Sequence, residues 1–101
     1  METTIHRPEE GSAVVQVKGR FTTDESEGFL KAVEPLLGEK LRNLSLELSQ
    51  LDFISSSGIR SLVMILKNCQ ANGTVLTLRN LTPQLKDILT LTALIDKFNV
   101  E

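Results

Sequence analysis

The alternation of apolar and polar residues divides the chain into strand-like and helix-like segments. Strands are expected at "SAVVQVKGRF", "NLSLELSQLDFI" and "TVLTLR", where apolar residues recur at every second position over most of each segment. Residues 22–38, 56–71 and 81–94 carry apolar residues at helical spacing. The pattern therefore predicts that strands and helices alternate along the chain.

Glycine and capping residues mark the expected ends of these segments. Gly19 is expected to break the first strand. Asp24, with Glu27 three residues later, is expected to cap the first helix. Thr82 followed by Pro83 predicts the start of the last helix, because proline is favoured at the first helical position.

This alternation predicts an α/β fold with a mostly parallel sheet and helices packed on it. With 101 residues the chain is expected to form a single domain. Residues 1–11 are expected to be either a mobile segment or an edge strand.

Composition excludes several classes of function. The net charge of -2 argues against nucleic-acid binding, which needs clustered Lys and Arg. Cys69 and His6 are the only residues of their types, so neither a disulfide framework nor a metal site is expected. No stretch is apolar enough for membrane insertion or for a signal peptide, so we expect a cytoplasmic protein without cofactors.

The helix expected at 56–71 has two distinct faces. Arg60, Met64 and Lys67 are expected to face solvent, with Ser61 near them. Met64 is then either a stray exposed methionine or part of a partner-binding surface, since methionine adapts readily to partners. The face expected in the core consists of Ile59, Leu62, Val63, Leu66 and Cys69.

The stretch "DFISSSGIRSL" places three serines between the second strand and this helix. One hydroxyl is enough to cap a helix, so the run is either redundant capping chemistry or includes a hydroxyl that is modified. Ligands bind beyond the carboxyl ends of parallel strands, where this loop is expected. Glu47 and Asp52 could form an acid–base pair, but we interpret them as solvating the sheet edge. No enzyme motif is present, and we expect no enzyme activity.

The stretch "LSLELSQLDFISSSGIRSLVMILK" resembles the signature of STAS domains, specifically the bacterial anti-sigma factor antagonists. "VVQVKGRF" resembles the early strand of that family, and "GTVLTLRNLTPQLKDILTLTALIDKF" resembles its last strand and helix. The resemblance covers residues 12–100 and implies a small STAS-like domain.

What the resemblance implies is a phosphorylation switch. The partner in such systems is both a serine kinase and an anti-sigma factor, with a histidine-kinase-like ATPase fold. It binds the unphosphorylated antagonist; phosphorylation breaks the complex, and a PP2C-type phosphatase restores binding. Carried over by position, the acceptor is Ser56, with Ser57 and Ser55 as less favoured alternatives.

Some positions depart from the family pattern. Ser55 stands where many members have Asp, while Arg60 and Met64 stand where some have Gly, so partner selectivity is expected to differ. The partner-binding surface implied by the resemblance consists of Ser55, Ser56, Ser57, Gly58, Arg60, Met64 and Lys67.

Two classes of function remain open at this point. The first is a partner-switching regulator, monomeric when free, whose output is transcription, secretion or biofilm formation. The second is a non-switching STAS subunit of a larger assembly, such as the cytosolic part of a transporter. The intact serine run favours the first.

Overall fold

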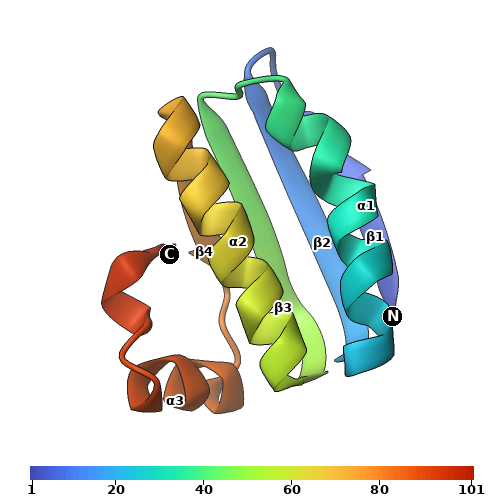
Figure 1. Ribbon diagram of the computed structural model, residues 1–101, viewed down its shortest axis with the longest axis vertical. Coiled ribbons are helices and arrows are strands. Elements are labelled where there is room, and N and C mark those ends of the chain that lie inside the picture. The colour runs from blue at the N-terminus through green and yellow to red at the C-terminus, as the bar shows by residue number, and fades with distance from the viewer.

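The structure is a computed structural model that describes residues 1–101. The fold is built on one five-stranded sheet (Figure 1). The strands lie in the order β1-β2-β3-β4-β5, with β1 antiparallel to β2 and all other neighbours parallel. The prediction of a mostly parallel sheet with an N-terminal edge strand is therefore confirmed. The bounds are β1 (Glu2–His6), β2 (Ser12–Phe21), β3 (Asn43–Ile54), β4 (Val75–Arg79) and β5 (Asn99–Val100).

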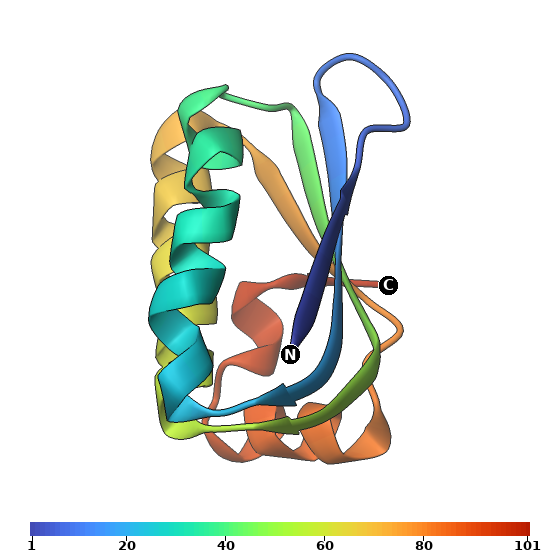
Figure 2. The ribbon, with the colours of Figure 1, turned by 90° about the vertical axis from the view of Figure 1, so that its right-hand side faces the viewer.

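Three α-helices connect the parallel strands: α1 (Ser26–Gly38), α2 (Ser56–Asn72) and α3 (Pro83–Leu91). Figure 2 shows α1 and α2 on one face of the sheet and α3 at its lower end. The two short 3-10 turns are Thr23–Glu25 and Ile95–Lys97. None of the helices combines the length and apolar character needed to cross a membrane.

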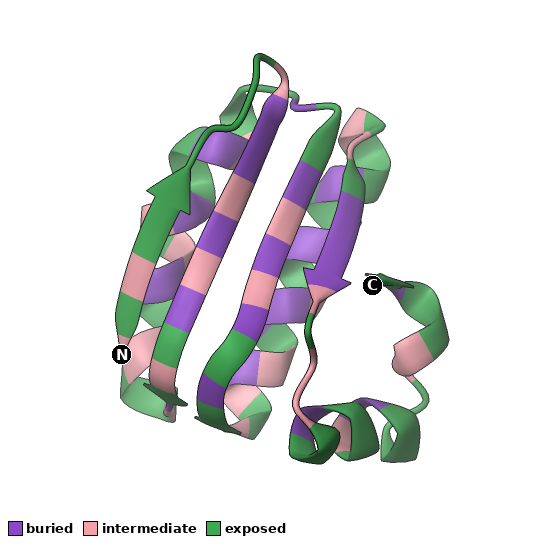
Figure 3. Ribbon diagram, turned by 180° about the vertical axis from the view of Figure 1, so that it is seen from behind, coloured by how far each residue is buried: buried purple, intermediate pink, exposed green.

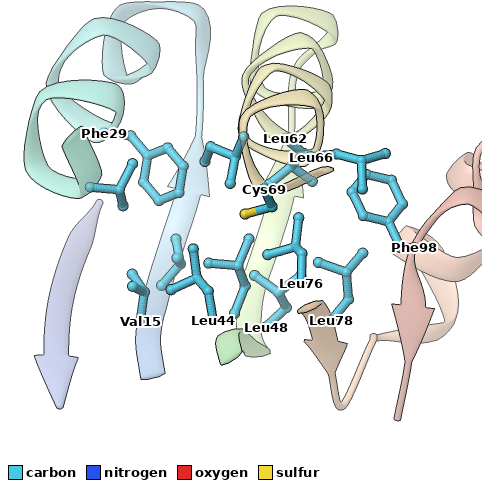
Figure 4. Close-up of a cluster of buried hydrophobic side chains, with 14 of the residues drawn as sticks. Val15, Phe29, Leu44, Leu48, Leu62, Leu66, Cys69, Leu76, Leu78 and Phe98 are labelled. Carbon is cyan, nitrogen blue, oxygen red and sulfur yellow. The ribbon is translucent and has the colours of Figure 1, made fainter. Parts of the chain in front are cut away.

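The core lies between the sheet and the two helices that cover it. Figure 4 shows Phe29 of α1 and Leu62 of α2 packed over strand residues such as Val15 and Leu44. Cys69 is buried in this layer, as predicted, and burial raises the pKa of its thiol. The opposite face carries no helix, and along β2 and β3 buried residues alternate with more exposed ones (Figure 3).

The predicted core face of α2 is partly wrong. Ile65 and Ser61 are buried, whereas Ile59 and Val63 are only half-buried. The buried arc includes Ile65, which faces α1, because α1 packs beside α2. The expectation that Ser61 lies near the solvent face is therefore corrected.

Two predicted boundaries are also wrong. Gly19 does not break β2, which continues to Phe21; Gly19 has φ +104° and adjoins a register shift against β3. Asp24 does not cap α1, because it lies inside the 3-10 turn that precedes the helix. The prediction for α3 is confirmed, since the Thr82 hydroxyl accepts a hydrogen bond from the Leu85 amide at 3.2 Å.

Candidate functional site

The serine run lies where β3 turns into α2, at the carboxyl end of the parallel strands. The backbone amide of Ser55 donates to the carbonyl of Phe21 at 2.8 Å, which ties the loop to the end of β2. Two register shifts between β2 and β3 place extra β3 residues opposite β2 just before this point. Such bulges re-aim side chains at strand ends, and here they bring both Leu51 and Ile54 into the core.

Ser55 is the capping residue of α2. Its backbone is extended, and its side-chain oxygen accepts a hydrogen bond from the Gly58 amide at 3.0 Å. Its carbonyl accepts the first helical bond, from the Ile59 amide, at 3.0 Å. Both the side chain and the backbone of Ser55 are therefore engaged in starting the helix.

Ser56 and Ser57 occupy the first turn with different exposure. Ser56 is exposed, and its hydroxyl forms no hydrogen bond within the protein. Ser57 is half-buried, and its carbonyl accepts a bond from the Ser61 hydroxyl at 3.1 Å. Among the three serines, Ser56 thus presents the most accessible hydroxyl, at a helix end whose free amides and partial positive charge favour anions.

Gly58 is buried and cannot present a side chain to a partner. A Cβ added at this position would lie 2.7 Å from Cγ1 of Ile54 and 2.9 Å from Cδ1 of Phe21. Its inclusion among the partner-binding residues stays a prediction, and it would have to act through its neighbours. The role of Gly58 is to let the first turn of α2 approach the ends of β2 and β3.

The outward face of α2 is placed as predicted. Arg60 and Lys67 are exposed, and Met64 is 52% exposed. Met64 lines a shallow groove of about 280 Å³ between α2 and α1, together with Leu30 and Leu37. An exposed methionine beside a groove provides adaptable apolar contact area.

Glu47 and Asp52 do not act as a carboxylate pair. The Glu47 carboxylate accepts from the Asn80 side-chain amide at 2.9 Å and from the Ser49 backbone amide at 3.3 Å. Burial works against ionisation of Glu47, but the hydrogen bonds from Asn80 and Ser49 outweigh it and lower the pKa of this carboxyl. Asp52 instead lines a pocket beside α3. No three potential metal ligands come together anywhere in the chain.

Sequence reasoning missed an exposed aromatic residue beside the serine loop. Phe53 is 41% exposed, and the Arg20 guanidinium carbon lies 4.5 Å from the centroid of its ring. The signal was the loss of alternation after Leu48, where the next buried residues, Leu51 and Ile54, are spaced by three. That spacing indicates bulges and a strand end whose outward side chains need not be polar.

Comparisons with known proteins agree with this architecture. A family model described as the STAS domain matches residues 4–101. A search of curated protein sequences finds no match.

Solved structures with the same fold include anti-sigma factor antagonists. The phosphorylated form of the Bacillus cell fate determinant SpoIIAA superposes with a TM-score of 0.80 at 13% identity, covering 99% of this chain and 91% of that chain. The unphosphorylated form of the anti-sigma factor antagonist SpoIIAA also gives 0.80, at 12% identity, covering 99% of this chain and 87% of that chain. An anti-sigma factor antagonist from Mycobacterium paratuberculosis gives 0.86 at 19% identity, covering 98% of this chain and 83% of that chain.

Proposed function

Because the chain belongs to the STAS domain family, we propose that it is an anti-sigma factor antagonist, a binding protein switched by phosphorylation of Ser56. The observation that carries this proposal is the division of labour among the serines. Ser55 is committed to capping, whereas the neighbouring Ser56 hydroxyl is exposed and unpaired. The existence of SpoIIAA structures in both phosphorylation states supports the proposal.

The modifying partner is a serine kinase that is also the anti-sigma factor and has a histidine-kinase-like ATPase fold. The Ser56 oxygen attacks the γ-phosphorus of ATP, the bond to ADP breaks, and the hydroxyl proton passes to a base of the kinase. The product phosphate lies at the N-terminus of α2, where free backbone amides tolerate an anion. The fold is thus retained, and the change is confined to the surface.

The added charge explains why the complex dissociates. Phosphorylation adds about -1.5 to -2 charges at neutral pH. In the complex, Ser56 lies near the nucleotide of the partner, so the new phosphate faces like charge. One such pair at about 4 Å costs about 4 kcal/mol at an effective dielectric of about 20, which is nearly a thousandfold in affinity. A PP2C-type phosphatase removes the phosphate and restores binding.

The contact surface of the unphosphorylated form extends from the serine loop along α2. Arg60, Met64 and Lys67 follow Ser56 on the exposed side of the helix. Met64 supplies apolar contact, and the two cations set which partners are accepted.

The test is phosphorylation with ATP by each histidine-kinase-like ATPase domain of the host, followed by phosphopeptide mapping. Ser56→Ala should abolish the label and keep the partner bound in the presence of ATP. Ser57→Ala is the matched control and should be labelled like the native protein. Label that persists in Ser56→Ala would move the site to Ser55 or Ser57, and no label on any serine would favour a non-switching subunit.

A second measurement tests the binding surface by calorimetry with the same partner. Met64→Asp should weaken binding about tenfold or more, because an apolar contact becomes a buried charge. Its melting curve should stay nearly unchanged, since Met64 is exposed. Unchanged affinity would place the interface elsewhere on the molecule.

A further inference from the structure

A pocket of about 400 Å³ lies between the end of β3 and helix α3, and its lining ends at Ile54, the residue before Ser55. Residues 51–54 form its β3 side, and Thr82, Gln84, Leu85, Asp87 and Ile88 form its α3 side. No residue of α2 lines it. Its volume is within the range of roughly 300–1,000 Å³ that is usual for small-molecule sites.

The lining of the pocket is mainly apolar. Leu51, Ile54 and Leu85 are buried, Ile88 is half-buried, and Phe53 is 41% exposed. The Arg20 guanidinium lies over the ring of Phe53, with its carbon 4.5 Å from the ring centroid. The pocket can therefore take up an apolar body and remove it from water.

The charged groups of the lining are all acidic. Asp52 and Asp87 are exposed, and neither carboxylate forms an ion pair or a hydrogen bond within the protein. No lysine, arginine or histidine lines the pocket, and Arg20 is placed over Phe53 outside the lining. Unpaired carboxylates at an apolar pocket attract a cation and repel phosphates and carboxylates.

From this combination we propose that the pocket binds a small organic cation, with an apolar body and an ammonium or guanidinium group. The apolar body would lie against Leu51, Leu85 and Ile88, and the charged group would face Asp52 and Asp87. A bare divalent metal does not fit, because no three potential metal ligands come together in the chain. The proposal goes beyond the phosphorylation switch and does not depend on it.

The test is a titration of the unphosphorylated, isotopically labelled protein, followed through its amide chemical shifts. Phenylbutylamine is the cationic probe, and phenylbutanol and phenylbutanoate are the neutral and anionic probes with the same apolar body. The amine should bind about tenfold more tightly than the anion, with shifts confined to residues 51–54 and 82–88. Equal binding of the anion, or shifts centred elsewhere, would overturn the proposal.

Matched variants connect the binding to the carboxylates. The double variant Asp52→Asn, Asp87→Asn should bind the amine more weakly by about threefold or more for each charge removed. Its affinity for phenylbutanol should stay unchanged. Asp24→Asn combined with Asp96→Asn removes two exposed carboxylates outside the pocket and should change neither probe. An equal loss in both double variants would mean that net charge alone attracts the amine, which contradicts a site.

A further titration tests whether the pocket binds a free small molecule or an arginine side chain of a partner protein. Acetyl-arginine amide carries a guanidinium on a short aliphatic stem, as a partner protein would present it. It should bind about tenfold more weakly than phenylbutylamine, because it fills less of the apolar lining. Binding as tight as that of the amine would overturn the assignment to a small molecule.

Discussion

The two corners at which β3 leads into α2 and β4 leads into α3 are capped alike but differ in the residue that follows the cap. Each helix starts with a hydroxyl residue in extended conformation, Ser55 or Thr82. The side-chain oxygen accepts from the amide three residues later, at 3.0 Å for α2 and 3.2 Å for α3. The next residue differs, because α2 continues with Ser56 and α3 with Pro83.

This difference supports the proposal that one hydroxyl of the serine run is modified. One hydroxyl caps each helix, and α3 then uses a proline, which has no amide to satisfy and fits the first turn. The Ser56 hydroxyl is therefore surplus to capping at the α2 corner. A surplus, exposed hydroxyl is what a kinase substrate needs, whereas the α3 corner offers none.

The first turn of α2 packs closely against the ends of β2 and β3, and the largest expected effect tests this packing. Gly58→Ala should destabilise the protein by about 1–3 kcal/mol, because its Cβ would overlap Ile54 and Phe21. Gly28 is the matched control: it is likewise the third residue of its helix, α1, and has nothing within 4 Å of an added Cβ. Gly28→Ala should be neutral or stabilise by up to about 1 kcal/mol.

Urea denaturation of the two variants measures both free energies of unfolding. Equal stabilities would show that the α2 corner relaxes around the new methyl group. The close packing against Phe21 would then not hold the serine loop in place.

The segments themselves could be predicted because their periodicity is local. Leu44, Leu46 and Leu48 alternate with polar residues, and Thr82 with Pro83 marks the start of α3. The burial of Ile65 could not be predicted, since it depends on α1 packing beside α2. That contact joins segments far apart in the chain.

The sequence indicated where the candidate site lies but not what each of its residues does. The run from Ser55 to Ser57 marks the helix start, yet only the backbone geometry shows which hydroxyl caps. The exposure of Phe53 follows two bulges in β3, which shift the register against β2. The pocket beside α3 was missed because its two sides are about 30 residues apart in the chain.

A smaller effect should distinguish capping from surplus hydroxyls. Ser55→Ala and Thr82→Ala should each cost about 0.5–2 kcal/mol, because each leaves a helix amide without its partner. Ser56→Ala should cost less than about 0.5 kcal/mol, as expected for an exposed residue without hydrogen bonds. Thermal melts of the three variants make the comparison, and a loss at Ser56 equal to that at Ser55 would contradict the assignment of the cap.

The smallest expected effect is a loss of stability at acidic pH. The Asn80 side chain, just before α3, donates to Glu47, while the α2 corner is tied down by a backbone bond from Ser55 to Phe21. Because the folded state lowers the pKa of Glu47, ionised Glu47 stabilises the protein above the pKa of a free glutamate, about 4.3. This contribution is lost as the pH falls through the lower pKa of the folded state.

Acidification should therefore loosen the α3 corner before the α2 corner. Hydrogen exchange of the amides at 80–82, 84 and 85 should accelerate relative to those at 55–59 as the pH is lowered through this range, after correction for intrinsic exchange rates. Glu47→Gln keeps an acceptor oxygen but cannot ionise, so the ratio of the two exchange rates should become nearly independent of pH. A ratio that still changes in this variant would assign the acid sensitivity to another carboxylate, and the two corners would then not differ in the way they are fastened to the sheet.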